Sequence, residues 1–440
     1  MNKNFKFIAS VLAFVFAFSA MAFGQGTTGS IEGTVTDANG AAVPNATVTV
    51  QSVGTTTGFS RTVTATSGGY VNIQGVPSGT YKVTISAANF AEKTAEVNVV
   101  VDKATSINSV LQVAGLTGEV EVIADSAVTI DTANNTVDTN ITKRVFEALP
   151  SGTQFGSLLK IAPNVRPEPL NAGFQIDGAS GAENVFVVDG QEVTNFRTGQ
   201  LNSNNNLPFE LLQEVQVKST GFSAEYGGAT GGVINAVTSG GNDQWRGNFG
   251  VSFTPSQLQG APRDFLNRFS TTVAPEYFTP AKDGGTGFFP VASISGPLVK
   301  SKVWFSAIYA PQIFETTRTV DYYTTGNNPN GRAISETIKY NSNIRTDEMF
   351  FRLDAQPFSK LRVYGTFLFN PIIQEGVLPG GALAGGSLAS WGNGSINNEG
   401  LNGAPQAAGS LRGAEFLGQQ GGRQNSNSFN GQATYTPNNW

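Results

Sequence analysis

The stretch EYGGATGGVINAVTSGGND, from Glu225 to Asp243, decides the fold of this chain. It sets three glycine pairs around one apolar run, Val233 to Val237, which has the composition of a strand. Glycine pairs often mark loops, because glycine adopts positive φ angles without steric cost. Glycines on both sides of a predicted strand also indicate a backbone that turns sharply or passes close to another segment. The neighbouring sequence decides between these two interpretations.

The composition excludes most catalytic chemistry and gives no sign of nucleic-acid binding. Among 440 residues, 27 are Lys or Arg and 32 are Asp or Glu, so the net charge is -5 and a basic footprint is lacking. The sequence has neither cysteine nor histidine, which excludes a Cys/His zinc site, a thiol nucleophile, a disulfide and a Ser-His-Asp triad. We therefore expect no enzyme, no catalytic residue, no metal site and no cofactor. The 52 glycines favour strands and turns over helices.

The first 24 residues have the pattern of a secretory signal peptide. Two lysines precede an apolar run from Phe7 to Phe18, and small residues follow at Ala20 and Ala22. The apolar run is too short to span a bilayer, and a buried helix is the alternative. The pattern predicts that residues 1–24 are removed and that the mature chain is exported.

Alternating strands between Gly29 and Leu111 predict a small all-β domain. About seven strands, each with one apolar face, would form a sandwich. The stretches GTVTDANGAAVPNATV (33–48) and GVPSGTYKV (75–83) resemble the carboxypeptidase regulatory-like domain, a transthyretin-like β-sandwich. The resemblance covers residues 28–113. It implies a structural or spacer domain, because its relatives carry no peptidase residues there.

Residues 126–243 mix short helices with strands, which predicts a compact α+β unit. Thr142 can cap a helix that Pro150 ends. We expect helices at 145–149 and 155–161, a strand at 185–188 with an Asp189-Gly190 turn, a helical turn at 208–213, and strands at 214–217 and 233–237.

Three segments of this unit, taken in order, resemble the plug domain of TonB-dependent outer-membrane receptors. They read DGASGAENVFVVDGQEV (177–193), PFELLQEVQVKS (208–219) and FSAEYGGATGGVINAVTSGG (222–241). The resemblance is to the Oar-like branch, which carries an N-terminal regulatory-like domain. It implies a structural plug motif made of Asp189, Gly190, Tyr226, Gly227, Gly231, Gly232 and Asn235. In this interpretation the glycines let the backbone fold back tightly, lie close to a barrel wall and feed the central strand of the plug sheet.

A phosphate-binding loop and a catalytic acid pair are alternative interpretations of this unit. A phosphate-binding P-loop would end in Lys-Ser or Lys-Thr before a helix, whereas a strand without such a lysine follows these glycines. Asp177 and Asp189 could form an acid pair, but a turn aspartate is far commoner than a catalytic one. We therefore assign no catalytic role to either aspartate.

Residues 244–440 alternate in the manner of transmembrane β-strands. Trp245, Phe249, Val251 and Phe253 alternate with polar residues, and the alternation recurs at 349–356 and 361–369 with all charges on one face. This pattern predicts apolar side chains toward lipid and polar ones toward a lumen. The edge of a soluble sandwich is the alternative.

Aromatic residues and glycine-rich stretches complete the barrel pattern. We expect an interfacial girdle of Trp304, Phe305, Tyr309, Tyr322 and Tyr323. The Gly/Asn/Ala-rich stretches 376–406 and 418–428 are typical of extracellular loops.

The region after residue 244 is short for a plugged barrel. It offers about seven strands, whereas a plugged transporter needs on the order of 22. Residues 432–440 also end in turn chemistry rather than in an apolar terminal strand. The sequence therefore predicts an N-terminal fragment. We expect a mainly β fold: a β-sandwich, an α+β plug and the first strands of an incomplete transmembrane antiparallel β-barrel.

The resemblance implies import across the outer membrane of a Gram-negative bacterium. TonB, with its inner-membrane energising proteins, would pair with a short extended segment before the plug and use the proton gradient to displace it. The candidate TonB box lies within 117–125 and consists of Glu119, Val120, Glu121, Val122, Ile123 and Ala124. An extracellular ligand and outer-membrane lipid are the other implied partners. The implied ligand classes are oligosaccharides, peptides and metal chelates.

Two other functions remain open at this point. The first is a surface adhesion or assembly protein that uses the barrel as an anchor, with the N-terminal sandwich as an interaction module. The second is a soluble periplasmic enzyme, which would require the strands after Trp245 to be soluble. Dependence on the proton gradient separates the importer from the adhesin.

Overall fold

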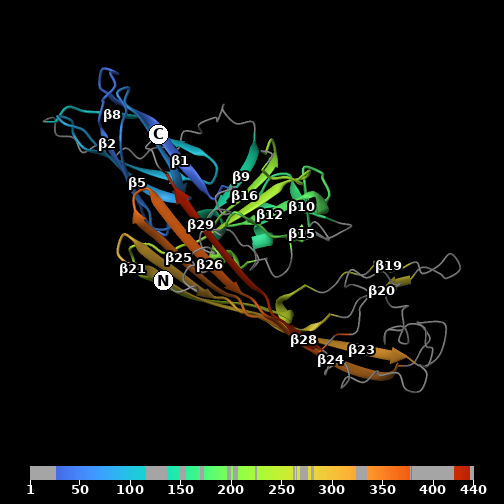
Figure 1. Ribbon diagram of the computed structural model, residues 1–440. Helices are drawn as coiled ribbons and strands as arrows, with labels where there is room; N and C mark the ends of the chain where they lie inside the picture. The colour runs from blue at the N-terminus through green and yellow to red at the C-terminus, as the bar shows by residue number, and fades with distance from the viewer. Residues whose placement is uncertain are drawn as a thin grey trace, which may run out of the picture.

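The computed structural model describes residues 26–114, 136–148, 155–168, 173–195, 200–201, 207–222, 225–260, 263, 265–267, 276–278, 282–323, 334–376, 378 and 421–436. They form three parts, which we call the sandwich, the plug and the wall. Figure 1 shows the sandwich in blue, the plug in green, and the wall as a long curved sheet from yellow to red.

The sandwich consists of two four-stranded sheets, as predicted. One contains β4 (Tyr70–Pro77), β1 (Thr28–Asp37), β7 (Ala104–Ser106) and β8 (Ser109–Leu111), and the other contains β3 (Ser60–Thr64), β2 (Thr47–Ser52), β5 (Gly79–Ser86) and β6 (Lys93–Val99). Every second side chain of these strands is buried, for example Val48 and Val50 on β2. The two inner faces share one apolar core, which makes the sandwich a domain with its own interior.

The plug is built on a five-stranded sheet in the order β13-β12-β17-β16-β9. Its strands are β13 (Gln191–Glu192), β12 (Val185–Val188), β17 (Val233–Thr238), β16 (Leu212–Thr220) and β9 (Val137–Thr142). β17 pairs in parallel with β12 and antiparallel with β16. All six residues of β17 are buried. The apolar run in the glycine-rich stretch is therefore the central strand of the sheet, as the resemblance implied.

Short helical segments and hairpins surround this sheet. They are α2 (Lys143–Ala148), η1 (Phe155–Ile161), η2 (Gly181–Glu183), η4 (Phe209–Leu211), and the strand pairs β10 (Val165–Pro167) with β11 (Phe174–Ile176) and β14 (Thr194–Asn195) with β15 (Gln200–Leu201). The predicted helical positions are confirmed, but η1 and η4 are 3-10 helices. η4 is shorter than the helical turn predicted at 208–213, because Leu212 already begins β16. In the part of the chain that the structure describes, no helix has the length and apolar character needed to cross a membrane.

The wall is a ten-stranded antiparallel sheet. Its strands are β18 (Arg246–Pro255), β21 (Gly284–Val299), β22 (Val303–Tyr309), β23 (Gln312–Tyr323), β24 (Ile334–Thr346), β25 (Met349–Phe358), β26 (Leu361–Phe369), β27 (Ile372–Glu375), β28 (Gly421–Gln424) and β29 (Asn427–Tyr435). A short 3-10 helix, η5 (Ser256–Leu258), and the hairpin of β19 (Phe265–Asn267) and β20 (Glu276–Phe278) lie between β18 and β21. Within the described residues β18 pairs only with β21, and β29 pairs only with β26. The sheet is curved and does not close, as expected.

Four long strands of the wall are each broken into two segments. The breaks fall between β22 and β23, β24 and β25, β26 and β27, and β28 and β29, at residues 310–311, 347–348, 370–371 and 425–426. Two breaks contain a proline, Pro311 and Pro371, which has no backbone N–H for a ladder hydrogen bond. The ten segments thus make six crossing strands in the described residues, against the seven or so that the sequence predicts.

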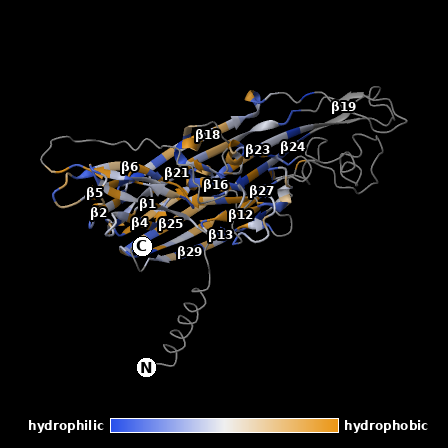
Figure 2. Ribbon diagram, turned by 90° about the horizontal axis from the view of Figure 1, so that it is seen from above, coloured by the Kyte–Doolittle hydropathy of each residue, from blue (hydrophilic) through white to orange (hydrophobic). Residues whose placement is uncertain are grey.

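The alternation of the wall strands is confirmed. On β25, Arg352 and Asp354 are buried toward the plug, whereas Phe351 and Leu353 on the other face are 43% and 37% exposed. The aromatic side chains predicted to face lipid on β18 are exposed as well, and Phe249 reaches 77%. Figure 2 shows hydrophobic and hydrophilic residues interspersed along these strands. One face of the wall is apolar and open, and much of the other, which mixes polar with apolar side chains, is covered by the plug.

Three predictions for the wall are wrong. Trp304 is not a girdle residue, because it lies in phase with the buried Ser306 and is itself only 2% exposed. The loop predicted at 418–428 contains β28 and the start of β29, since backbone pairing with β27 and β26 needs no large side chain. β29 also takes in Gln432 to Tyr435, which had been assigned to a terminal turn. Phe305 and Tyr309 lie on the outer face, and the side chains of Tyr322 and Tyr323 lie outside the described residues.

Candidate functional site

The Asp189-Gly190 turn of the plug contacts the wall. Both residues have positive φ angles, 48° and 79°, as expected for an Asp-Gly hairpin turn between β12 and β13. The carbonyl oxygen of Asp189 accepts hydrogen bonds from the Tyr364 hydroxyl at 3.0 Å and from Asn430 Nδ2 at 2.8 Å. These two residues belong to β26 and β29, so the turn is held by side chains of the wall.

The carboxylate of Asp189 is bound by the end of the central strand. It accepts from the backbone N–H of Thr238 at 2.9 Å and from the Thr238 hydroxyl at 2.6 Å. The same hydroxyl accepts from Arg352 Nη1 at 2.7 Å, and that nitrogen lies 3.4 Å from Asp189 Oδ1. Thr238 therefore links the plug carboxylate to an arginine of the wall.

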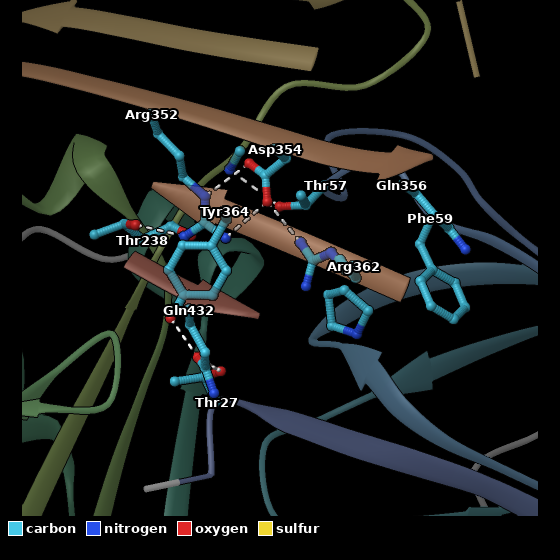
Figure 3. Close-up of polar contacts among 12 residues, drawn as sticks. Thr27, Thr57, Phe59, Thr238, Arg352, Asp354, Gln356, Arg362, Tyr364 and Gln432 are labelled. Atoms are coloured by element: carbon cyan, nitrogen blue, oxygen red, sulfur yellow. Dashed lines mark hydrogen bonds and ion pairs between the residues drawn. The ribbon is translucent and has the colours of Figure 1, made fainter. Parts of the chain in front are cut away.

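Arg352 forms a cluster with two other buried charged residues of the wall, Asp354 and Arg362. Its Nε and Nη2 donate to the two oxygens of Asp354 at 2.8 and 3.0 Å, and Arg362 Nη2 donates to Asp354 Oδ1 at 2.7 Å. Asp354 has no exposed surface, and both arginines are less than 7% exposed. The ring of Tyr364 lies 4.4 Å from the Arg352 guanidinium carbon. Figure 3 shows this cluster, with Thr238 on one side and Arg362 on the other.

The cluster is a packed junction rather than a ligand site. With Asp189 it contains two acidic and two basic groups, so the buried charges compensate one another. The hollow beside it has a volume of about 10 Å³, close to the smallest space that holds one water. Among the described residues, no group of three or more His, Cys, Asp or Glu side chains could hold a metal ion.

The other residues of the predicted plug motif lie away from this junction. Tyr226 is 2% exposed and accepts from Lys218 Nζ at 3.0 Å, and Asn235 Nδ2 donates to the carbonyl of Gly26 at 3.0 Å. A Cβ on Gly231 would stand 2.7 Å from Asn184 Oδ1, and one on Gly232 would stand 2.6 Å from Ile176 Cδ1. These two glycines permit close packing inside the plug.

Gly227 differs from the other motif glycines, because a Cβ there would meet nothing within 4 Å. The structure therefore brings Asp189 and Gly190 to the wall, Gly231 and Gly232 into the plug interior, and Tyr226 and Asn235 to the face under the sandwich. The candidate TonB box, residues 119–124, lies outside the described residues.

Two family models and one relative match parts of this chain. Residues 30–112 match the family model of the carboxypeptidase regulatory-like domain, and residues 128–233 match that of the TonB-dependent receptor plug domain. The TonB-dependent transporter Oar of Myxococcus xanthus is 28% identical over 333 residues, which cover 73% of this chain and 30% of the transporter. The chain has the domain composition of an Oar-like TonB-dependent receptor. It spans about a third of the length of that relative.

Two solved structures of outer-membrane proteins are among those similar to this chain. The outer-membrane transporter YddB of Escherichia coli has a TM-score of 0.41 and 19% identity, covering 54% of this chain and 33% of that one. A ferric enterobactin receptor of Pseudomonas aeruginosa, PfeA, has a TM-score of 0.37 and 15% identity, covering 55% and 34%.

The last glycine pair of residues 225–243 brings the plug close to the wall. A Cβ on Gly240 would stand 2.5 Å from Asp354 Oδ2, and one on Gly241 would stand 2.2 Å from the carbonyl oxygen of Phe305. The glycines that lie close to the wall therefore follow the central strand, whereas Gly231 and Gly232, which precede it, pack inside the plug. Beside it, Asp243 accepts from Trp304 Nε1 at 2.7 Å, which explains why that tryptophan points inward.

Sequence reasoning missed the wall's half of the junction. Arg352, Asp354 and Arg362 were assigned to an inward face, but nothing paired them with Asp189 or Thr238. The available signal was that a strand bordering lipid carried charges on one face only. Such charges must find partners inside the receptor, because a buried unpaired charge is costly.

A second, larger space lies between the plug and the first wall strands. Its volume is about 1180 Å³. Side chains of α2 and η4 line one side, and inward residues of β18, β21 and β22 line the other, among them Asn248, Ser252, Ser293, Ser295 and Ser306. Unlike the charged junction, this space is large enough for a solute.

Proposed function

We propose that this chain is part of an outer-membrane receptor that imports a ligand by TonB-driven displacement of its plug. The observation that carries the proposal is the junction of Asp189 with Arg352, Tyr364 and Asn430. The contacts that this junction makes between plug and wall are polar, so water can replace them when the plug moves. The plug and wall also share an apolar cluster that includes Phe350 and Leu368, and parting it requires an external source of energy.

TonB would supply that energy by binding the segment 117–125. Residues 119–124 precede the plug and alternate apolar with acidic side chains up to Val122. Pairing by strand addition uses backbone hydrogen bonds, so the side chains can be loosely specified. The proposed location is the outer membrane, reached after removal of the signal peptide, residues 1–24.

The proposed ligand is an oligosaccharide, a peptide or a metal chelate. The space of about 1180 Å³ beside α2 supports a solute path along the wall. Its lining combines serine and asparagine side chains with the charged residues Lys143, Glu147, Glu210 and Arg246, which together can bind neutral and charged polar groups on a passing ligand.

Binding of the C-terminal domain of TonB to the full-length receptor tests the proposal. Val122→Pro removes a backbone donor and fixes φ, whereas Val122→Ala keeps the backbone intact. We expect the proline variant to bind at least about tenfold more weakly, which corresponds to roughly 1.4 kcal/mol, and the alanine variant to bind as the parent does.

Titration calorimetry separates the outcomes. If the proline variant binds TonB as tightly as the parent does, residues 119–124 are not the TonB box. No binding by the parent receptor would contradict the importer itself and favour the surface adhesion or assembly protein, whose function needs neither TonB nor the proton gradient.

A further inference from the structure

One face of plug strand β16 is polar and completely covered. Val215 and Val217 point into the plug core, whereas Glu214, Gln216 and Lys218 point to the other side. These three polar residues are 1%, 1% and 4% exposed. Buried polar groups need partners, and the sandwich supplies them here.

The turn between β6 and β7 of the sandwich covers this face. Val101, which has no exposed surface, donates its backbone N–H to the Glu214 carboxylate oxygens at 3.1 and 3.2 Å. Its carbonyl oxygen accepts from Gln216 Nε2 at 3.1 Å. Two plug side chains thus satisfy both backbone groups of one sandwich residue.

Two ion pairs join the same surfaces. Lys218 is paired with Asp102, and Lys103 Nζ lies 2.8 Å from Asp138 Oδ1 on β9. Burial alone would lower the pKa of Lys218, but hydrogen bonds to Asp102 and Tyr226 raise it above its ordinary value. Both pairs cross from sandwich to plug, so separation would leave each charge without its opposite partner.

A second contact joins the sandwich to the end of the plug. Gly58 donates its N–H to the carbonyl of Gly241 at 2.7 Å, and Gly240 donates to the Thr57 hydroxyl at 3.0 Å. Asn242 Nδ2 donates to the carbonyl of Gly54 at 2.8 Å. The sandwich therefore holds the plug at two places, beside β16 and beyond β17.

The contacts between the sandwich and the wall are fewer. Ser60 exchanges two backbone hydrogen bonds with the Gln356 side chain, at 3.2 and 2.9 Å, and Arg61 donates to the carbonyl of Ser359 at 3.1 Å and to the Thr436 hydroxyl at 3.4 Å. The Thr27 hydroxyl donates to Gln432 Oε1 at 3.3 Å, and Gly58 packs against the ring of Trp304. In the described part of the chain, no ion pair joins sandwich and wall. On the plug side, separation would also expose the hydrogen bonds of the fully buried Glu214 and Gln216 and break two half-buried ion pairs, so parting the sandwich from the wall costs less.

We propose that the sandwich and the plug are one body, and that the sandwich leaves the wall with the plug when the plug is displaced. This inference rests on the proposed function, because it takes displacement of the plug as given. The chain connectivity supports it: residues 115–135, which contain the candidate TonB box, run directly from the sandwich to the plug. A pull on that segment acts on both domains at once.

Cross-linking in cells tests which surfaces part. The chain has no cysteine, so each introduced pair is unique within it. Lys103→Cys with Asp138→Cys reports on sandwich and plug, and Ser60→Cys with Ser359→Cys reports on sandwich and wall. Thr49→Cys with Thr62→Cys, whose hydroxyls lie 3.0 Å apart within the sandwich, is the control for reagent access. Each full-length variant is treated with a short bismaleimide in cells with and without TonB or the proton gradient.

We expect energised cells to cross-link the sandwich–wall pair about half as much as de-energised cells or less, as the population shifts. The sandwich–plug pair should cross-link equally in both, as should the control. A fall confined to the sandwich–plug pair, or shared by both pairs, would overturn the inference and leave plug displacement standing. No change in either pair would overturn the proposed displacement together with the inference.

Discussion

Gly241 of the plug lies against the backbone of Phe305 on the wall. A Cβ on Gly241 would stand 2.2 Å from the Phe305 carbonyl oxygen and 2.9 Å from its nitrogen. Backbone atoms cannot rotate out of the way as the end of a flexible side chain can. The glycine at this position therefore sets how closely the plug approaches the wall.

Gly241→Ala should push the end of the plug away from the wall. Overpacking costs typically 1–3 kcal/mol, and the rigid neighbour places this site at about the upper end of that range. The measurement is the urea concentration at which the plug of the full-length receptor becomes sensitive to protease. Gly227→Ala is the control, because a Cβ there meets nothing, and it should change stability by less than about 0.5 kcal/mol. Equal shifts for the two variants would show that the close approach does not matter.

Asp354→Asn should destabilise the junction far more than loss of a surface ion pair. Asp354 is the shared partner of Arg352 and Arg362, and its loss leaves two buried guanidinium groups short of negative charge. Removing one partner of a buried pair costs roughly 3–5 kcal/mol. Asp283→Asn breaks the partly exposed pair with Arg318 and should cost about 1 kcal/mol or less. Chemical unfolding of both variants in detergent measures the difference, and similar costs would contradict a structural role for the buried cluster.

Much of the junction's plug side could be predicted from local sequence. Asp189 and Gly190 form a turn because an Asp-Gly pair adopts the required positive φ angles, and the strand before them is a continuous apolar run. Arg352 lies 163 residues further along the chain, and no local pattern connects the two positions. Without the fold, the partner of a buried charge can be inferred to exist but cannot be named.

The wrong prediction for Trp304 can be explained from the sequence. Aromatic residues near strand ends favour the membrane interface, and that preference led to the girdle assignment. Side chains alternate between the two faces of a strand, and Ser306 and Ile308, which lie on the same face as Trp304, both point inward. The alternation therefore places Trp304 inside, against the preference of tryptophan for the membrane interface. The orientation is fixed by Asp243, which accepts from the indole nitrogen, and by Gly58, which leaves space for the ring.

Tyr226→Phe should weaken the plug surface beneath the sandwich. The Tyr226 hydroxyl accepts from Lys218 Nζ at 3.0 Å, and the ring stays in place 4.5 Å from that nitrogen when only the oxygen is removed. Loss of one buried hydrogen bond to a charged group costs about 1.5–3 kcal/mol. Tyr70→Phe, at an exposed tyrosine that donates to Glu32, should have almost no effect. Thermal unfolding of the two variants would contradict this assignment if Tyr70→Phe proved as costly as Tyr226→Phe.

Glu214 should make the contact between sandwich and plug depend on pH. Burial, with a smaller contribution from nearby Asp138, raises the pKa of this carboxyl from 4.5 to about 7, although hydrogen bonds from Asn140 and the Val101 N–H oppose the rise. Between pH 4.5 and 7, an undocked or unfolded Glu214 is ionised while the docked one keeps its proton. The docked state is therefore most stable below about pH 4.5 and loses up to about 3 kcal/mol as the pH rises to 7 and above, since one pKa unit is worth about 1.4 kcal/mol.

Glu214→Gln should remove this part of the pH dependence, because the amide oxygen can still accept from Val101 but never ionises. Urea unfolding of the full-length receptor at pH 5 and pH 8 gives the measurement, and the variant should lose less stability than the parent between the two. At pH 8 it should be the more stable protein. Glu96→Gln, on the exposed face of β6, controls for the loss of one carboxylate and should follow the parent. A parent and a Glu214→Gln variant with the same pH dependence would show that Glu214 ionises freely, and hence that the sandwich does not cover β16 in solution.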